Sequence, residues 1–373
     1  MTPYESLREQ LLVCPKAWLV TGGAGFIGSH LLEALLRLNQ RVIGLDNYST
    51  GSRKNLDDVQ GLVASAQWAN FLRIDGDIRD LETCRRASLG VDFVLHHAAL
   101  DSVTGSITNP DDTHASNVNG FLNILIAARD NKVRRVVYAS SRSAYGDHPD
   151  SPSADYKLGR CLSPHAVTKR ANELYAEAFA RCYGLESIGL RYFNVFGARQ
   201  QATDGAAAVI PKWIAALLRN ESVHMNGNGN SAFAFCYVAN VIQANLLAAA
   251  TDTPDAINEI YNIGPHSASN PNEFLRTLRQ NLLNGHRRPK RSRNLNYDVE
   301  PGDGLPFDAD VSKAARLLGY QPTHTVEQGL IEALPWYRQN FSPMPEHSIR
   351  PSRRKRMPSP DSVSAIVFST PHV

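Results

Sequence analysis

The stretch AWLVTGGAGFIG, residues 17–28, decides the fold of this chain. Its apolar first half predicts a buried strand, and an apolar repeat from Ile27 to Leu38 predicts a helix directly after the turn. The turn itself reads GxxGxxG from Gly22 to Gly28. Glycine is needed where a chain turns tightly and where backbone approaches a pyrophosphate, whose charge then lies on the helix N-terminus. The stretch therefore predicts a strand, a turn and a helix that bind a dinucleotide.

Strands and helices continue to alternate after this unit. Periodicity predicts strands over Arg41 to Asp46, Phe71 to Asp75, Val91 to His96, Val133 to Ser140 and Leu185 to Arg191. It predicts helices over Ser116 to Asn131 and His165 to Tyr183, the second with Pro164 at its entry and Gly184 at its exit. Because strands that alternate with helices form βαβ units, we expect an α/β fold with a Rossmann-type, doubly wound parallel sheet.

The chain divides into three predicted regions. Residues 1–195 form the dinucleotide-binding domain, to which strands return later in the chain. Residues 196–341 form mainly a smaller α/β substrate-binding region, with helices predicted over Ala207 to Leu218, Val238 to Ala250 and Pro271 to Asn281. Residues 342–373 are rich in Pro, Ser and Arg, and we expect them to form a disordered basic tail.

Composition describes an ordinary globular protein without a nucleic-acid partner. Hydrophobic residues make up 43%, and the formal net charge of +3 is too mild to predict binding to nucleic acid. The 5 cysteines show neither CxxC spacing nor a histidine at metal-ligand intervals, which predicts no metal site and a reducing cytoplasm. No apolar run approaches the roughly 18 residues of a membrane span, so we expect no membrane insertion.

The ends of the next strands indicate how the dinucleotide is held. Asp46 ends the second strand, 18 residues past Gly28, where a carboxylate can bind the adenosine ribose hydroxyls and repel a 2′-phosphate. This predicts NAD rather than NADP. We expect Asp77 and Ile78, after the third strand, to line the adenine, and His96 to Ala99, after the fourth, to line the nicotinamide side. Paired histidines at a strand end are, however, more often packing residues.

These features resemble the extended short-chain dehydrogenase/reductase superfamily and, within its NAD-dependent epimerase/dehydratase family, the 4-epimerases of UDP-N-acetylglucosamine and of its uronic acid. The similarity extends from about residue 4 to residue 340. The stretches that carry it are GxxGxxG, HxAA at His96, Asn117, Ser140-Ser141, YGDHP at 145–149, KRANELYA at 169–176, RYFNVFG at 191–197 and VIPKW at 209–213. The resemblance implies cofactor contacts from Gly22, Gly25, Phe26, Ile27, Gly28, Asp46, Asn47, Asp77, Ile78, Ala98 and Lys169.

The resemblance also implies a catalytic set. In that family a tyrosine and a lysine four residues later share one helix face. The tyrosinate removes the sugar C4 hydroxyl proton as hydride passes to NAD, the lysine holds the nicotinamide ribose, and a serine completes the site. The 4-keto sugar then rotates, and hydride returns to its other face. Ser141 and Lys169 match the serine and the lysine, but His165 stands at the tyrosine position, and Arg142 adjoins Ser141.

A histidine at position 165 changes the chemistry that this set can perform. Lys169 and Arg142 should lower its pKa from about 6.5, so that a neutral imidazole could accept a proton at neutral pH. Its nitrogen stops short of a phenol oxygen by roughly 2 Å, and a displacement of about 1 Å can cost about a hundredfold in rate. Proton uptake would also place a second cation beside Lys169.

The substrate end departs from the family pattern as well. Two arginines that clamp the UDP diphosphate in the family correspond here to Phe233 and Leu305, so two bidentate phosphate contacts are lost. Asn194 is retained. Arg199 could meet a phosphate, although an exposed structural arginine is the more frequent role. The substrate-binding candidates are Ser141, Arg142, Asn194 and Arg199.

The sequence is compatible with two alternative functions. The first is NAD-dependent 4-epimerisation of a UDP-N-acetylhexosamine, or of its uronic acid, for surface-polysaccharide synthesis, with Ser141, His165 and Lys169 as a modified catalytic set. The second is a noncatalytic NAD-binding protein that kept the fold and lost the chemistry. A nucleotide-sugar dehydratase is disfavoured, because Arg142 and Ser143 stand where that group carries an acidic pair.

The resemblance extends to assembly. The predicted helices over Ser116 to Asn131 and His165 to Tyr183 correspond to those that pair into a four-helix interface in the superfamily. We therefore expect a homodimer.

Overall fold

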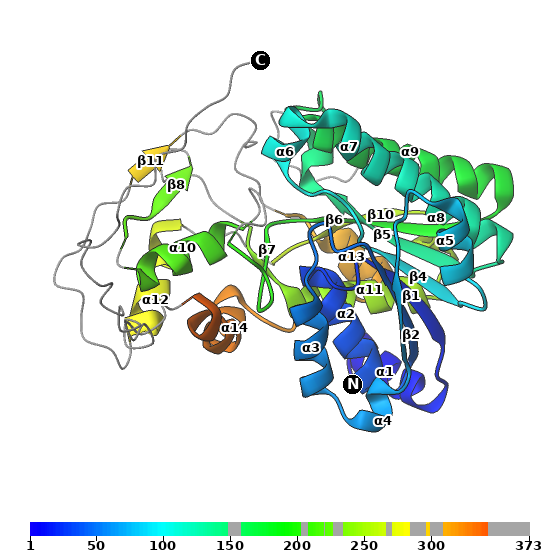
Figure 1. Cartoon of the computed structure of the whole chain (residues 1–373), viewed down its shortest axis with the longest axis horizontal. Helices are drawn as coiled ribbons and strands as arrows, with labels where there is room; N and C mark the ends of the chain where they lie inside the picture. Colours follow the sequence, from blue (N-terminus) through cyan, green and yellow to red (C-terminus); the bar gives the residue numbers. More distant parts are fainter. Residues whose placement is uncertain are drawn as a thin grey trace, which may run out of the picture. The chain divides into compact units, whose positions relative to one another are not determined.

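A seven-stranded parallel sheet forms the core of the computed structural model (Figure 1). The structure describes residues 1–147, 158–202, 208–219, 221–226, 234–265, 271–283, 296–298 and 309–341. The strand order is β10-β6-β5-β4-β1-β2-β3. The strands are β1 (Ala17–Thr21), β2 (Arg41–Asp46), β3 (Phe71–Asp75), β4 (Phe93–His96), β5 (Arg135–Ser141), β6 (Glu186–Tyr192) and β10 (Ile260–Ile263). Every neighbouring pair runs parallel, which confirms the expected Rossmann-type fold.

Successive side chains of β1 enter two different hydrophobic cores, one on each face of the sheet. Trp18 and Val20 pack in the core that includes Leu35 of α2 (Phe26–Arg37), whereas Leu19 packs in the core that includes Phe121 of α8 (Gly120–Asp130). A strand whose successive residues are all apolar presents apolar side chains on both faces and must be covered on both sides. The continuous apolar run at this strand therefore reflects its position in the middle of a doubly covered sheet.

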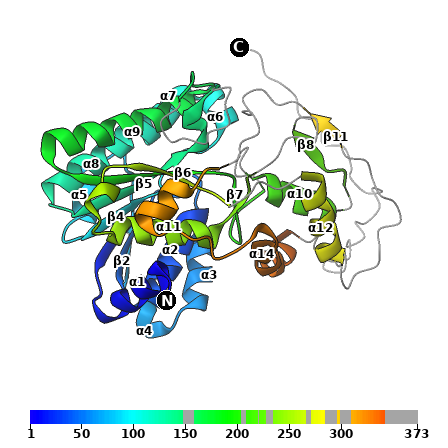
Figure 2. The same cartoon turned by 180° about the vertical axis from the view of Figure 1, so that it is seen from behind.

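Helices cover both faces, as the two opposite views show (Figures 1 and 2). One face carries α5 (Leu81–Ala87), α8 and α9 (Pro164–Tyr183). The other carries α2 and α11 (Val238–Ala250), with α1 (Pro3–Val13) and α13 (Ser312–Leu318) packed on α11. Shorter elements complete this part: α3 (Arg53–Leu62), α4 (Ser65–Trp68), α6 (Val103–Thr108), α7 (Pro110–His114), η2 (Arg142–Tyr145) and η3 (Pro254–Ala256). None of the described helices is both long and apolar enough to span a bilayer.

After β6 the chain leaves the sheet and forms a smaller group of elements. Helix α10 (Val209–Leu218) packs against α12 (Pro271–Leu283) and α14 (Val326–Phe341). Two short parallel pairs accompany them: β7 (Val195–Phe196) with β9 (Cys236–Tyr237), and β8 (His224–Asn226) with β11 (Asn296–Asp298). Between these segments β10 returns to the sheet beside β6, so residues on both sides of position 195 build one sheet.

The helix predicted over Ser116 to Asn131 is interrupted. Its first turn is a π-helix, η1 (Ala115–Asn119), and α8 follows it. At this turn the Asn117 side chain accepts a hydrogen bond from the Leu100 backbone N–H at 2.8 Å and donates one to the Leu100 carbonyl at 3.0 Å. Asn117 therefore joins the π-helical turn to the loop that follows β4.

Several predictions concern residues outside the described ranges. They include Phe233 and Leu305, the two expected losses at the substrate end, and residues 342–373, the expected basic tail.

Candidate active site

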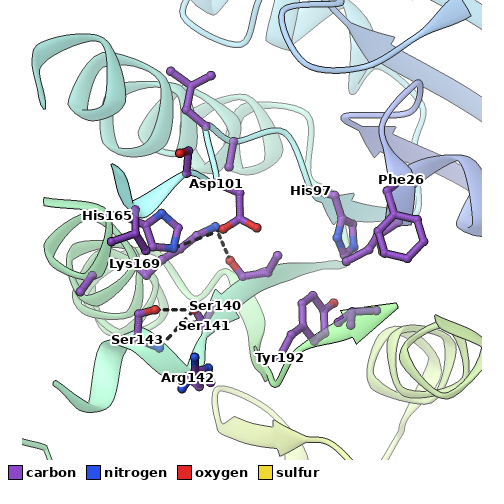
Figure 3. Close-up of a pocket in the computed structure, with 18 of the residues that line it drawn as sticks. Phe26, His97, Asp101, Ser140, Ser141, Arg142, Ser143, His165, Lys169 and Tyr192 are labelled. Atoms are coloured by element: carbon purple, nitrogen blue, oxygen red, sulfur yellow. Dashed lines mark hydrogen bonds and ion pairs between the residues drawn. The ribbon is translucent and has the colours of Figure 1, made fainter. Parts of the chain in front are cut away.

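A cavity of about 560 Å³ lies at the carboxyl ends of β1, β4, β5 and β6. This edge of a doubly wound sheet is where such folds bind ligands. The lining residues come from the glycine turn, the loop after β4, the end of β5, η2, α9 and the segment after β6, and Figure 3 shows part of this lining. The cavity is therefore assembled from segments far apart in the sequence.

The glycine turn fits a dinucleotide pyrophosphate. Gly22 has φ +70°, and a Cβ atom there would lie 2.8 Å from the Ala98 backbone nitrogen. A Cβ atom at Gly28 would lie 2.0 Å from the Gly22 carbonyl oxygen. Gly25 precedes α2 without a side-chain cap, so the first amides of that helix remain available to an anion. Gly22, Gly25, Phe26, Ile27 and Gly28, all cofactor candidates, line the cavity.

The adenosine-side candidates form a hydrogen-bonded group beside the cavity rather than in its wall. The Asp46 carboxylate accepts the Ala24 and Tyr48 backbone N–H groups at 2.8 and 2.7 Å, which ties the end of β2 to the glycine turn. Asn47 donates to Asp77 at 2.8 Å. Burial alone would raise the pKa of Asp77, but hydrogen bonds from Arg79 and Asn47 outweigh it and lower this pKa to about 2. Ile78 is buried, and Ala98 follows His97 directly.

The two histidines at the end of β4 have different positions. His96 is buried, with Nδ1 at 2.8 Å from Thr21 Oγ1, so it is a packing residue. His97 lines the cavity, stacks on Tyr192 with ring centroids 5.9 Å apart, and places Nε2 at 3.1 Å from Asn245 Oδ1. Burial lowers the pKa of His97 to about 4, so its ring is neutral at neutral pH. A neutral stacked ring forms a flat wall between the glycine turn and β6.

The three catalytic candidates, Ser141, His165 and Lys169, line the same cavity. Lys169 is buried and donates from Nζ to the Ala139 carbonyl of β5 at 2.9 Å. Burial lowers the pKa of Lys169. Ser141 Oγ lies 3.1 Å from Ser143 Oγ and accepts the Ser143 backbone N–H. The end of β5 and the first turns of α9 thus place a hydroxyl, an imidazole and an ammonium group around one space.

Asp101 is a cavity residue that the sequence analysis did not identify. Its Oδ1 lies 3.3 Å from His165 Nε2 (Figure 3). His165 is held in place by its backbone N–H, which donates to Ser106 Oγ at 3.1 Å. Burial lowers the pKa of His165, and Lys169 lowers it further, whereas the Asp101 carboxylate and a hydrogen bond with the Leu100 backbone oppose the decrease. Lys169 therefore lowers the pKa of His165, as its proximity predicts, and the Asp101 carboxylate offsets part of that decrease.

Among the substrate candidates, Asn194 and Arg142 line the cavity. Asn194 also accepts the Cys236 backbone N–H through its carbonyl, which fixes the segment after β6. Arg199 differs from the expected exposed arginine, and that expectation is wrong. It is 2% exposed and binds Glu33 of α2 at 2.7 Å, with the same nitrogen 2.7 Å from His30 Nδ1.

A buried group of charged and polar side chains connects α9 to the sheet. Glu173, one turn after Lys169, accepts hydrogen bonds from Arg191 of β6 at 2.8 Å and from Ser140 of β5 at 2.7 Å. Arg170 binds the other Glu173 oxygen at 2.9 Å. Burial alone would raise the pKa of Glu173, but the hydrogen bonds and charge of Arg191 outweigh it and lower this pKa. The carboxylate therefore joins α9 to the two strands whose ends form the cavity.

Comparison with known proteins agrees with this geometry. Residues 18–264 match the model of the NAD-dependent epimerase/dehydratase family. A putative UDP-glucose 4-epimerase of Methanocaldococcus jannaschii is 34% identical over 324 residues, 86% of this chain and 98% of that protein.

Two solved structures extend the comparison. The UDP-N-acetylglucosamine 4-epimerase of Methanobrevibacter ruminantium, in complex with UDP-N-acetylmuramic acid, is 32% identical with a TM-score of 0.77, covering 87% of this chain and 99% of that one. The UDP-glucuronic acid 4-epimerase of Bacillus cereus, in complex with UDP-glucuronic acid and NAD, is 27% identical with a TM-score of 0.76 and the same coverage.

Proposed function

Because this chain belongs to the NAD-dependent epimerase/dehydratase family, we propose that it interconverts the C4 epimers of a UDP-N-acetylhexosamine or of its uronic acid. The observation that carries the proposal is the shared cavity, in which Ser141, His165 and Lys169 lie opposite a glycine turn that fits a dinucleotide. In the cell this activity would serve surface-polysaccharide synthesis in the cytoplasm.

The residues of the cavity have separate roles in this proposal. Bound NAD supplies a reversible hydride acceptor for the sugar C4 carbon. Gly22, Gly25 and Gly28 admit its pyrophosphate, and Lys169 holds its nicotinamide ribose. Ser141 offers a hydroxyl to the C4 oxygen. Asn194 and Arg142 contact the nucleotide sugar.

The test is to incubate the purified protein with UDP-N-acetylglucosamine, UDP-glucose and UDP-glucuronate and to separate the epimers by chromatography. We expect conversion of at least one sugar and a loss of at least about 100-fold in Lys169→Ala, because a preorganised cation at the reacting centre contributes on this scale. Protein that carries NAD yet converts none of them would contradict the proposal and favour the noncatalytic alternative. A product lighter by one water would indicate a dehydratase.

We also propose a homodimer formed through α9. Its outer face exposes Val167, Leu174 and Tyr175, which lie on one side of the helix by their spacing of seven and eight residues. Exposed apolar side chains grouped in this way favour a protein contact. We expect twice the chain mass in light scattering at micromolar concentration and the single-chain mass for Leu174→Glu. A wild-type mass of one chain would exclude the dimer.

A further inference from the structure

The wall of the cavity contains an acidic side chain with no role in the function proposed above. Asp101 lies in the loop between β4 and α6 and lines the cavity, with Oδ1 at 3.3 Å from His165 Nε2. The two partners differ sharply in exposure: the Asp101 side chain is 66% exposed, whereas that of His165 is 2% exposed. The carboxylate therefore stands on the open side of the pair, and the imidazole stands behind it.

Both partners are fixed by the surrounding backbone. Leu100, which precedes Asp101, is held at its N–H and its carbonyl by Asn117. Ser102, which follows it, caps α6 by accepting the Gly105 N–H at 2.9 Å. The carboxylate is thus carried between two anchored residues, and its position near His165 does not depend on a free loop.

The hydrogen bonding of His165 assigns its role in the pair. Its Nδ1 is buried and has no hydrogen-bond partner among the described residues. A lone pair without a partner is less costly than an N–H without one, which favours a proton on Nε2. The protonated Nε2 then faces Asp101 Oδ1 at 3.3 Å, and the second carboxylate oxygen is left to the cavity.

We propose, building on the function above, that Asp101 is the group that accepts the proton of the reacting sugar hydroxyl, and that His165 is a positioning residue that orients its carboxylate. A tyrosine would extend beyond an imidazole by roughly 2 Å, a displacement that matters for rate. Asp101 lies on the cavity side of His165. The imidazole of His165 and the carboxylate of Asp101 together therefore occupy the space that one tyrosine side chain would occupy.

The step balances without further components. The O–H bond of the C4 hydroxyl breaks, its proton goes to the free Asp101 oxygen, and its electron pair forms the C4 carbonyl. The C4–H bond breaks at the same time, and its hydride goes to the oxidised nicotinamide. The return step reverses each transfer, with the proton restored by Asp101. His165 stays neutral throughout, so no second cation arises beside Lys169.

The groups that could influence a pH profile are few in the described part of the site. Besides Asp101 itself, the ionisable side chains that line the cavity are His165 and Lys169 from α9, His97 after β4, Arg142 of η2 and Tyr192 of β6. Helix α6 carries no ionisable side chain, and α7 carries Asp111, Asp112 and His114, all exposed.

The decisive variant is Asp101→Asn, which keeps the size of the side chain and removes the base. We expect kcat to fall by about 100-fold to 10,000-fold, the usual contribution of a general base, while Asp111→Asn, exposed on α7 outside the cavity, retains wild-type activity. His165→Gln, which keeps an N–H donor, should lose less activity than His165→Leu. Activity of Asp101→Asn within about threefold of an active wild type would overturn this inference and leave epimerisation standing; a wild type that converts no UDP-sugar would overturn both.

A second measurement does not rely on turnover. The His165 imidazole can be titrated by NMR in the NAD-loaded chain, its signal being identified by its loss in His165→Gln. Because the carboxylate raises the pKa of His165, we expect a lower His165 pKa in Asp101→Asn. An unchanged His165 pKa would contradict the assigned roles.

Discussion

Replacing Glu173 by alanine is expected to lower the free energy of unfolding by about 3–5 kcal/mol, because breaking a buried ion pair on one side leaves the other charge without its partner. Glu173 and Arg191 are buried, and the same carboxylate also binds Ser140 and Arg170. The loss would separate α9 from β5 and β6, so we expect activity to fall together with stability. Urea denaturation of the wild type and the variant measures the difference.

Glu177→Ala is the matched control. Glu177 lies one turn further along α9 and is exposed, and its ion pair with Arg181 is exposed on both sides. Exposed pairs contribute about 0–1 kcal/mol, so this variant should unfold close to the wild type. A Glu173→Ala effect no larger than that of Glu177→Ala would contradict the role of the buried group.

The pH dependence of the Glu173 effect has a definite sign. Arg191 lowers the pKa of Glu173 in the folded chain, so its contribution to stability is complete above the unfolded value of about 4.3. That contribution is lost as the pH falls through the folded value. The difference in unfolding free energy between the wild type and Glu173→Ala should therefore shrink below about pH 4.

Replacing Gly28 by alanine is expected to weaken NAD binding by about 10–100-fold and to lower the free energy of unfolding by about 1–3 kcal/mol. The new Cβ atom would lie 2.0 Å from the Gly22 carbonyl oxygen and 2.7 Å from its carbon, so the turn that receives the pyrophosphate must move. Calorimetric titration with NAD and urea denaturation measure the two effects.

A second glycine supplies the comparison. Gly61 lies in α3, and an added Cβ atom would meet nothing within 4 Å. Replacing a glycine inside a helix by alanine normally raises the free energy of unfolding by about 1 kcal/mol. Gly61→Ala should therefore be stabilising with unchanged NAD affinity, whereas Gly28→Ala should show the opposite sign. Equal behaviour of the two variants would refute the close approach at Gly28.

The sheet was predictable because its strands carry local signals. β1, β2 and β3 begin and end where periodicity places them. β1 carries the strongest signal, because it is covered on both faces and is therefore apolar on both. The glycine turn was predictable for a similar reason, because its positive φ and its close contacts admit few other residues. The π-helical turn was not, because the periodicity of its residues is that of an ordinary helix and the contact of Asn117 with Leu100 joins separate segments.

The difference between local motifs and contacts between distant segments also explains which site residues could be predicted. Ser141, His165 and Lys169 were found through a motif, whereas Asp101 has no motif of its own and is recognised only by its distance from His165. Its position shortly after HHAA at a strand end was the one available signal. Arg199 was misjudged because its partner, Glu33, is far away in the sequence. An arginine in a loop is usually exposed, and only the folded chain shows the carboxylate that Arg199 binds.

The return of β10 to the edge of β6 has a consequence for how such a chain can diversify. Residues 260–263 pair with residues 189–192, although the substrate-side elements lie between them in the chain. Exchanging the C-terminal half for that of an unrelated protein would remove the hydrogen bonds between β10 and β6. β6 would then be an exposed edge strand, which can pair with other chains. New sugar preferences are therefore more accessible through point substitutions around the cavity than through recombination of modules.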